Sequence, residues 1–105
     1  MGVVIVNTVF YSVVEEEKER NLERQETYLN EIKKLPKGFL VTKKRGNKTY
    51  FYLQFWNGEK NVSKYIKNDT NIDEIKNQIA ERKHLEGIMK RLKLEYKQMC
   101  KVVRE

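Results

Sequence analysis

The chain has 105 residues, with 22 lysines and arginines against 15 acidic residues and a net charge of +7. This length suits one domain with a modest core, and 39% hydrophobic residues with 10% aromatic residues is too rich for a disordered chain. A single cysteine, Cys100, excludes an internal disulfide, so we expect an intracellular, cytoplasmic protein.

Residues 3–14 are the most apolar stretch of the chain and begin with a valine and isoleucine run at residues 3–6. The stretch is too short to span a bilayer, and it lacks the basic start and the cleavage site of a secretory signal. We therefore expect no membrane association, and we expect a strand or a helix start that packs on the core. A segment that pairs with another subunit is the alternative.

A first helix is predicted over residues 13–35. Leu22, Leu29 and Ile32 recur at helical spacing among glutamate, lysine, arginine and glutamine, which favour helix. We expect the helix to end before Pro36, because proline disfavours helical geometry in the residue before it.

A three-stranded antiparallel meander is predicted over residues 39–67, where the apolar residues change from the period of a helix to that of a strand. Two short connections, Gly46-Asn47 and Asn57-Gly58, are of the kind that joins strands in tight hairpins. They divide the segment into strands at residues 39–45, 48–56 and 59–67.

If both turns have two residues, the register follows, with Arg45 opposite Lys48 and Trp56 opposite Glu59. Alternation along the strands then gives the sheet two unlike faces. The expected core face carries Leu40, Thr42, Thr49, Phe51, Leu53, Phe55, Val62 and Ile66. The opposite face, called the outer face from here on, carries Phe39, Val41, Lys43, Arg45, Lys48, Tyr50, Tyr52, Gln54, Trp56, Asn61, Ser63, Tyr65 and Lys67.

A second helix is predicted over residues 72–103, after a loop in which Asn71 and Glu74 resemble a capping box. Its apolar stripe is weakened only by Arg82 and Gly87. A helix of this length is longer than so small a domain is usually wide. We therefore expect it to bend near Gly87, to lie along the first helix, or to protrude toward a partner.

The net positive charge belongs to the predicted sheet, since residues 37–67 hold eight basic residues against one acid and the rest of the chain sums to zero. Residues 15–31 are mainly acidic and residues 82–104 mainly basic. An antiparallel pair of helices would bring these opposite charges together. The same pairing could join two copies of the chain, so a homodimer through the second helix is among the expected partners.

Together these elements predict an α+β fold in a single domain over residues 1–105. In that fold, a three-stranded antiparallel β-meander is flanked by an N-terminal helix and a long C-terminal helix. The chain shows no internal repeat and no low-complexity linker.

The sequence lacks the parts of an enzyme or of a cofactor site. It has one histidine, His84, and one cysteine, Cys100, and it contains no CxxC, HExxH, GxSxG or glycine-rich phosphate loop. We therefore expect no enzymatic activity, no catalytic residue, no metal site and no cofactor.

The outer face combines lysine and arginine for phosphates, tyrosine for stacking, and amide and hydroxyl groups for base edges. We therefore predict a DNA- or RNA-binding module. Its predicted site consists of Lys43, Arg45, Lys48, Tyr50, Tyr52, Gln54, Asn61, Ser63, Tyr65 and Lys67.

An ordinary solvated sheet is one alternative, because tyrosine favours strands and edge lysines discourage aggregation. A protein-interaction or inhibitor role, with the basic face against an acidic protein surface, is the other.

Several short motifs follow one another in the middle of the chain: LPKG at residues 35–38, GNKTYFYLQ at residues 46–54, GEK at residues 58–60 and SKYI at residues 63–66. In this order the sequence resembles a small uncharacterised domain family of firmicutes and some archaea, over about residues 28–85. That family often occurs near mobile elements, so the resemblance implies a phage or mobile-element accessory protein with a tyrosine-rich meander, and it implies no known activity.

A weaker likeness is to the arm-type DNA-binding domains of tyrosine recombinases. These are similar in placing a three-stranded sheet before a helix, and they insert the sheet into the major groove. The likeness implies DNA binding by analogy of architecture.

Overall fold

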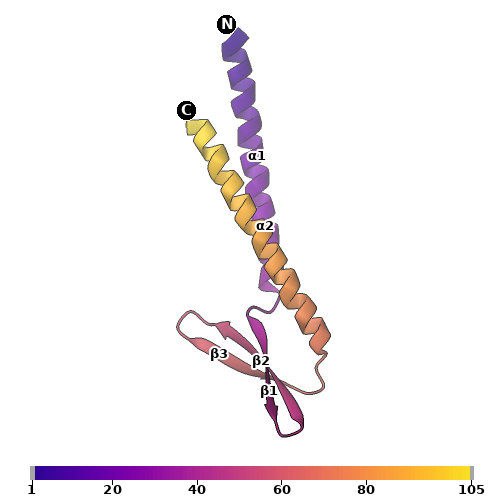
Figure 1. The fold of residues 1–105 in the computed structure, drawn as a ribbon. Helices are drawn as coiled ribbons and strands as arrows, with labels where there is room; N and C mark the ends of the chain where they lie inside the picture. The colour runs from indigo at the N-terminus through magenta and orange to yellow at the C-terminus, as the bar shows by residue number, and fades with distance from the viewer. Residues whose placement is uncertain (1, 105) are drawn as a thin grey trace. The chain divides into compact units, whose positions relative to one another are not determined.

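The structure is a computed structural model that describes the backbone of residues 2–104 and the side chains of residues 9–102. Its elements are α1 (Gly2–Lys33), β1 (Phe39–Arg45), β2 (Lys48–Trp56), β3 (Asn61–Ile66) and α2 (Ile72–Arg104) (Figure 1). This is the predicted α+β arrangement of a three-stranded antiparallel sheet between two helices.

The chain divides into two compact units. The sheet unit comprises Lys34–His84, and the helical unit comprises the residues up to Lys33 together with those from Leu85 onward. The expectation that residues 1–105 form one domain concerns the relation between these units, and it stays a prediction.

The first helix begins at Gly2, not at residue 13. Its apolar start is helical although β-branched residues favour strands. The sheet contains only β1, β2 and β3 among the described residues, so no strand pairs with this segment, and a helix satisfies its backbone groups internally. The expected packing of residues 3–8 on the core lies outside the described side chains. That expectation is wrong for Val9 and Phe10, which are 59% and 50% exposed.

In the helical unit, the second part of α2 lies antiparallel to α1 (Figure 1). Asn21, only 3% exposed, donates from Nδ2 to the carbonyl oxygen of Leu92 at 3.0 Å. Nearby, Lys18 Nζ lies 5.8 Å from the centroid of the Tyr96 ring. Of the three courses expected for the second helix, this unit shows the one along α1, and the chain remains helical at Gly87. The orientation is the one that the opposite charges of the two helices favour.

The first hairpin of the sheet unit has the predicted register. Arg45 pairs with Lys48 across the two-residue turn Gly46-Asn47. Gly46 has a φ of +64°, and no described residue other than glycine has a positive φ. A positive φ at the first turn position alone fits a type II′ turn, which requires glycine there.

The second hairpin differs from the prediction. Residues 57–60 connect β2 to β3, and Trp56 pairs with Asn61, not with Glu59. The side chain of Asn57 builds this wider loop, because its Oδ1 accepts hydrogen bonds from two backbone N–H groups of the loop at 2.9 and 3.0 Å. The pairing has moved by two residues, and such a shift leaves the side chains of β3, residues 61–66, on their predicted faces.

The apolar face of the sheet lies where the alternation predicts, but it does not form a closed core. Thr42 and Thr49 on this face are exposed. Its large apolar residues are half-buried: Leu40, Phe51, Leu53, Phe55, Val62 and Ile66. The first part of α2 covers this face through Ile75 and Ile79, of which Ile79 is 8% exposed. One helix, about 10 Å wide, covers three strands incompletely.

The segment between α1 and β1 depends on Gly38. Its φ is +100°, and a Cβ built on it would lie 2.9 Å from the Cβ of Phe55 and closer still to the carbonyl oxygen of Gln54. Only glycine fits such a close backbone approach. Arg82, which interrupts the apolar stripe of α2, donates from Nη1 to the carbonyl oxygen of Leu35 at 2.6 Å. The arginine thus holds the turn that precedes the sheet.

Candidate nucleic-acid interface

The β1–β2 hairpin extends past β3 as a ribbon of two strands. β3 pairs with β2 only from Phe51 onward, whereas β1 pairs with β2 back to Lys48. We call the two-stranded part, residues 43–50, the arm (Figure 1). The arm contains four basic residues and no acid: Lys43, Lys44, Arg45 and Lys48, all of them exposed.

The tip of the arm places like charges directly across from each other. Arg45 and Lys48 are a cross-strand pair next to the turn. Like charges in directly opposed positions destabilise a sheet, so this pair opposes the fold that contains it. An anion bound at the tip removes that repulsion. A local conflict of this kind is typical of functional sites.

The middle of the outer face is a cluster of three tyrosines. The ring centroids of Tyr50 and Tyr65 are 6.2 Å apart, and those of Tyr52 and Tyr65 are 5.6 Å apart. The Tyr65 hydroxyl donates to Oδ1 of Asn68 at 3.0 Å. The rings therefore contact one another and form one aromatic surface between the arm and the rest of the sheet.

Lys43 joins this cluster from β1. Its Nζ lies 4.8 Å from the centroid of the Tyr52 ring, within the range of a cation–π contact. One face of Tyr52 is thus occupied by an amine of the same chain. Tyr65, at 44% exposed, is left as the most open of the three rings.

The far end of the outer face is polar and aromatic without charge. Gln54 pairs with Ser63, and Trp56 pairs with Asn61. Phe39, opposite Gln54 on the other side, is 54% exposed, and Trp56 is 56% exposed. The predicted amide and hydroxyl groups therefore lie beside two open aromatic rings and away from the arm.

The structure gathers all of the predicted site residues except Lys67 on the outer face. Lys67 follows the end of β3 and lines a cavity on the opposite side of the sheet, together with Leu53 and Ile75. The alternation along the predicted third strand placed it on the outer face, but the strand ends at Ile66 and the alternation ends with it.

Three exposed residues of the arm and the outer face are absent from the predicted site. Lys44 faces the apolar side of the sheet by alternation, yet it is exposed because the arm extends beyond the covered part of that face. Phe39 and Trp56 belong to the outer face by register, and both rings are exposed in the structure. If the bounds of β3 were known, its shorter length relative to β2 would predict that one end of the β1–β2 hairpin has no third strand beside it.

The described residues contain no group of three or more histidine, cysteine, aspartate or glutamate side chains that could hold a metal ion. Neither described helix is apolar enough along its length to cross a membrane. His84 is exposed on α2, and Cys100 is a half-buried free thiol.

Comparison with known proteins places most of this chain in one family. A family model described as a domain of unknown function, DUF6788, matches residues 14–77, which is more than half of the chain. The match contains the last part of α1, the whole sheet and the start of α2. No curated protein and no solved structure matches the chain.

Proposed function

The chain belongs to the DUF6788 family, a domain of unknown function, and we propose that it is a nucleic-acid-binding module that inserts its arm into the major groove of duplex DNA. The observation that carries the proposal is the composition of the arm, which has four basic residues and no acid over residues 43–50. The major groove of B-DNA is about 12 Å wide and admits a ribbon of two strands about 4.8 Å apart.

The position of the charges suits contact with the DNA backbone on both walls of the groove. Arg45 and Lys48 lie at the tip, while Lys43 and Lys44 point to opposite faces of the ribbon. Arginine at the tip has the donor geometry to read guanine, and the lysines neutralise phosphates. Gln54 lies about 13 Å along β2 from the last residue of the arm, so it would contact flanking backbone and not the same bases.

Duplex DNA is favoured over RNA on groove geometry. The major groove of A-form RNA is deep and narrow, and side chains do not reach its base edges. Single strands would use the tyrosines as a stacking platform, but those rings already contact one another and Lys43.

The likeness to arm-type domains of recombinases supports groove insertion, and the resemblance to a family found near mobile elements supports a phage or mobile-element accessory role.

The proposal is tested by fluorescence anisotropy with a labelled mixed-sequence DNA duplex, an RNA duplex of the same sequence and the single DNA strand. We expect the DNA duplex to bind most tightly. The double substitution Lys44→Gln and Lys48→Gln should weaken binding at least tenfold at moderate salt, because two phosphate contacts are lost. Lys60→Gln with Lys64→Gln removes the same charge outside the arm and should change affinity little. Equal loss in both variants would show that general charge, not the arm, binds DNA.

A protein partner is the second candidate, and the exposed rings of Phe39 and Trp56 favour it. Tyrosine and tryptophan are the residues that most often anchor protein interfaces, and a basic surface around them suits an acidic partner. A preparation free of nucleic acid that binds no DNA at low salt, yet elutes as a stable dimer or hetero-complex, would support this candidate over the first. In that case Trp56→Ala should dissociate the complex.

A further inference from the structure

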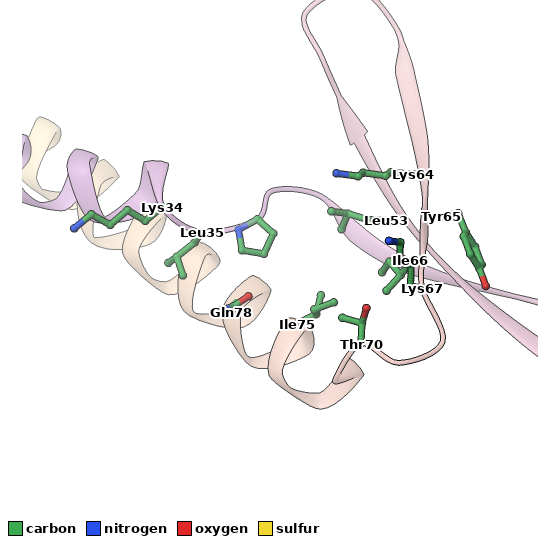
Figure 2. Close-up of a pocket in the computed structure, with 11 residues that line it drawn as sticks. Lys34, Leu35, Leu53, Lys64, Tyr65, Ile66, Lys67, Thr70, Ile75 and Gln78 are labelled. Atoms are coloured by element: carbon green, nitrogen blue, oxygen red, sulfur yellow. The ribbon is translucent and has the colours of Figure 1, made fainter.

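The sheet unit contains a cavity of about 580 Å³ on the face opposite the outer face. Its walls come from the segment after α1, from β2 and β3, and from the first turns of α2. Figure 2 shows Leu53 and Ile66 directed into it from the sheet and Ile75 from the helix, whereas Tyr65 points away. The interior is thus apolar, and it coincides with the part of the inner face that α2 leaves half-covered.

The polar groups around this apolar interior are all neutral or positive. Lys34, Lys64 and Lys67 line the cavity, and no aspartate or glutamate stands among the described residues that do so. Thr70 and Gln78 add a hydroxyl and an amide at the helix side. Lys64 and Lys67 are both exposed, so their amines can reach a group at the mouth.

We propose that this cavity binds a small amphipathic anion, namely a carboxylate with a compact apolar body such as a medium-chain or aromatic acid. The body would lie against Leu53, Ile66 and Ile75, and the carboxylate would meet the amines of Lys64 and Lys67 at the mouth. Pockets for small ligands have volumes of about 300–1,000 Å³, apolar linings and a few polar groups, and this cavity has all three features.

The charge of the lining selects the head group. A cation would meet the positive amines of Lys64 and Lys67 and no carboxylate among the described lining residues, whereas a neutral alcohol would offer these two amines no charged partner. A hydrogen bond between an amine and a carboxylate is stronger than one between neutral groups. The long lysine stems also pack along apolar surface while their amines stay in water, which suits a ligand with an apolar body and a charged end.

This site is independent of the proposed DNA interface. Lys64 is opposite Leu53 on the inner face, whereas the tyrosine cluster belongs to the outer face and no residue of the arm lines the cavity. A nucleic-acid backbone has phosphates but no apolar body to fill such a cavity. Binding of the anion and binding of DNA can therefore succeed or fail separately.

Titration of the ¹⁵N-labelled protein, followed by amide chemical shifts, tests the proposal with three probes that share a ten-carbon chain, each kept below its micelle concentration or, for the alcohol, its solubility limit. These are decanoate, decanol and decyltrimethylammonium. We expect saturable shifts at Leu53, Ile66 and Ile75 with decanoate, at least tenfold weaker binding of decanol, and no binding of the cation. Equal affinity for decanoate and decanol would overturn the proposal, as would shifts outside the cavity or none at millimolar decanoate.

Two double variants locate the site. Lys64→Gln with Lys67→Gln should weaken decanoate binding at least tenfold and leave the decanol affinity unchanged. Lys44→Gln with Lys48→Gln removes the same charge from the arm and should leave decanoate binding unchanged. If both variants weaken it equally, the anion binds the general positive field and the cavity assignment is wrong. An acidic peptide that binds there while decanoate does not would also overturn it.

Discussion

Removal of two arm lysines should flatten the salt dependence of DNA binding by a calculable amount. Each phosphate contact made by a lysine or arginine contributes about −0.9 to the slope of log K against log salt on duplex DNA. If all four basic residues of the arm contact phosphates, affinity should fall roughly 150-fold between 50 and 200 mM salt. For Lys44→Gln with Lys48→Gln the same change in salt should reduce affinity only about 12-fold.

The measurement is fluorescence anisotropy on one labelled duplex at four or more salt concentrations, with both proteins at matched folded fraction. The slope is the informative quantity, because an unfolded fraction shifts the affinity at every salt concentration and leaves the slope unchanged. The Lys60→Gln and Lys64→Gln control should keep the slope of the unaltered protein. Parallel lines for the arm variant and the unaltered protein would refute the idea that these lysines contact phosphates.

Other predictions concern stability and are measured by urea unfolding. Gly38→Ala should destabilise the protein by about 2 kcal/mol or more, because alanine disfavours a φ of +100° and its Cβ would meet the backbone of β2. Gly87→Ala, in a helix with open space around it, should stabilise by about 0.5–1 kcal/mol, and a loss would contradict the helical assignment there. Asn21→Ala should destabilise by about 1–2 kcal/mol through the lost hydrogen bond to Leu92, whereas the exposed Asn30→Ala should change little.

The sequence was informative wherever a local signal decides the structure. Gly46-Asn47 specifies a two-residue turn, and the register that it implies is the one observed. At Asn57-Gly58 the same kind of signal was misleading, because the asparagine side chain bonds to the loop backbone and stabilises a longer connection. The predicted faces of the sheet were still correct, since the register moved by an even number of residues.

Long-range partners explain what the sequence did not reveal. Asn21 is buried in the charged part of α1, where it donates a hydrogen bond to a carbonyl of α2, and no local pattern marks that pair. Arg82 breaks the apolar stripe for a similar reason, since its partner is the carbonyl of Leu35. The apolar start of α1 favours a strand by composition, but it is helical, and a helix satisfies its backbone hydrogen bonds without a neighbouring strand.

The distribution of charge over the sheet bears on whether the basic residues serve solubility or binding. Lysines discourage edge-to-edge aggregation, and both edges of a sheet are open to it. Here the edge strand β1 has three basic residues among seven, whereas the edge strand β3 has one among six. The basic residues of β1 lie on the arm, where Arg45 is opposite the like-charged Lys48 of β2, and this pair destabilises the hairpin. Protection of edges alone explains neither the asymmetry nor the pair, whereas contact between the arm and a polyanion, as proposed, would explain both.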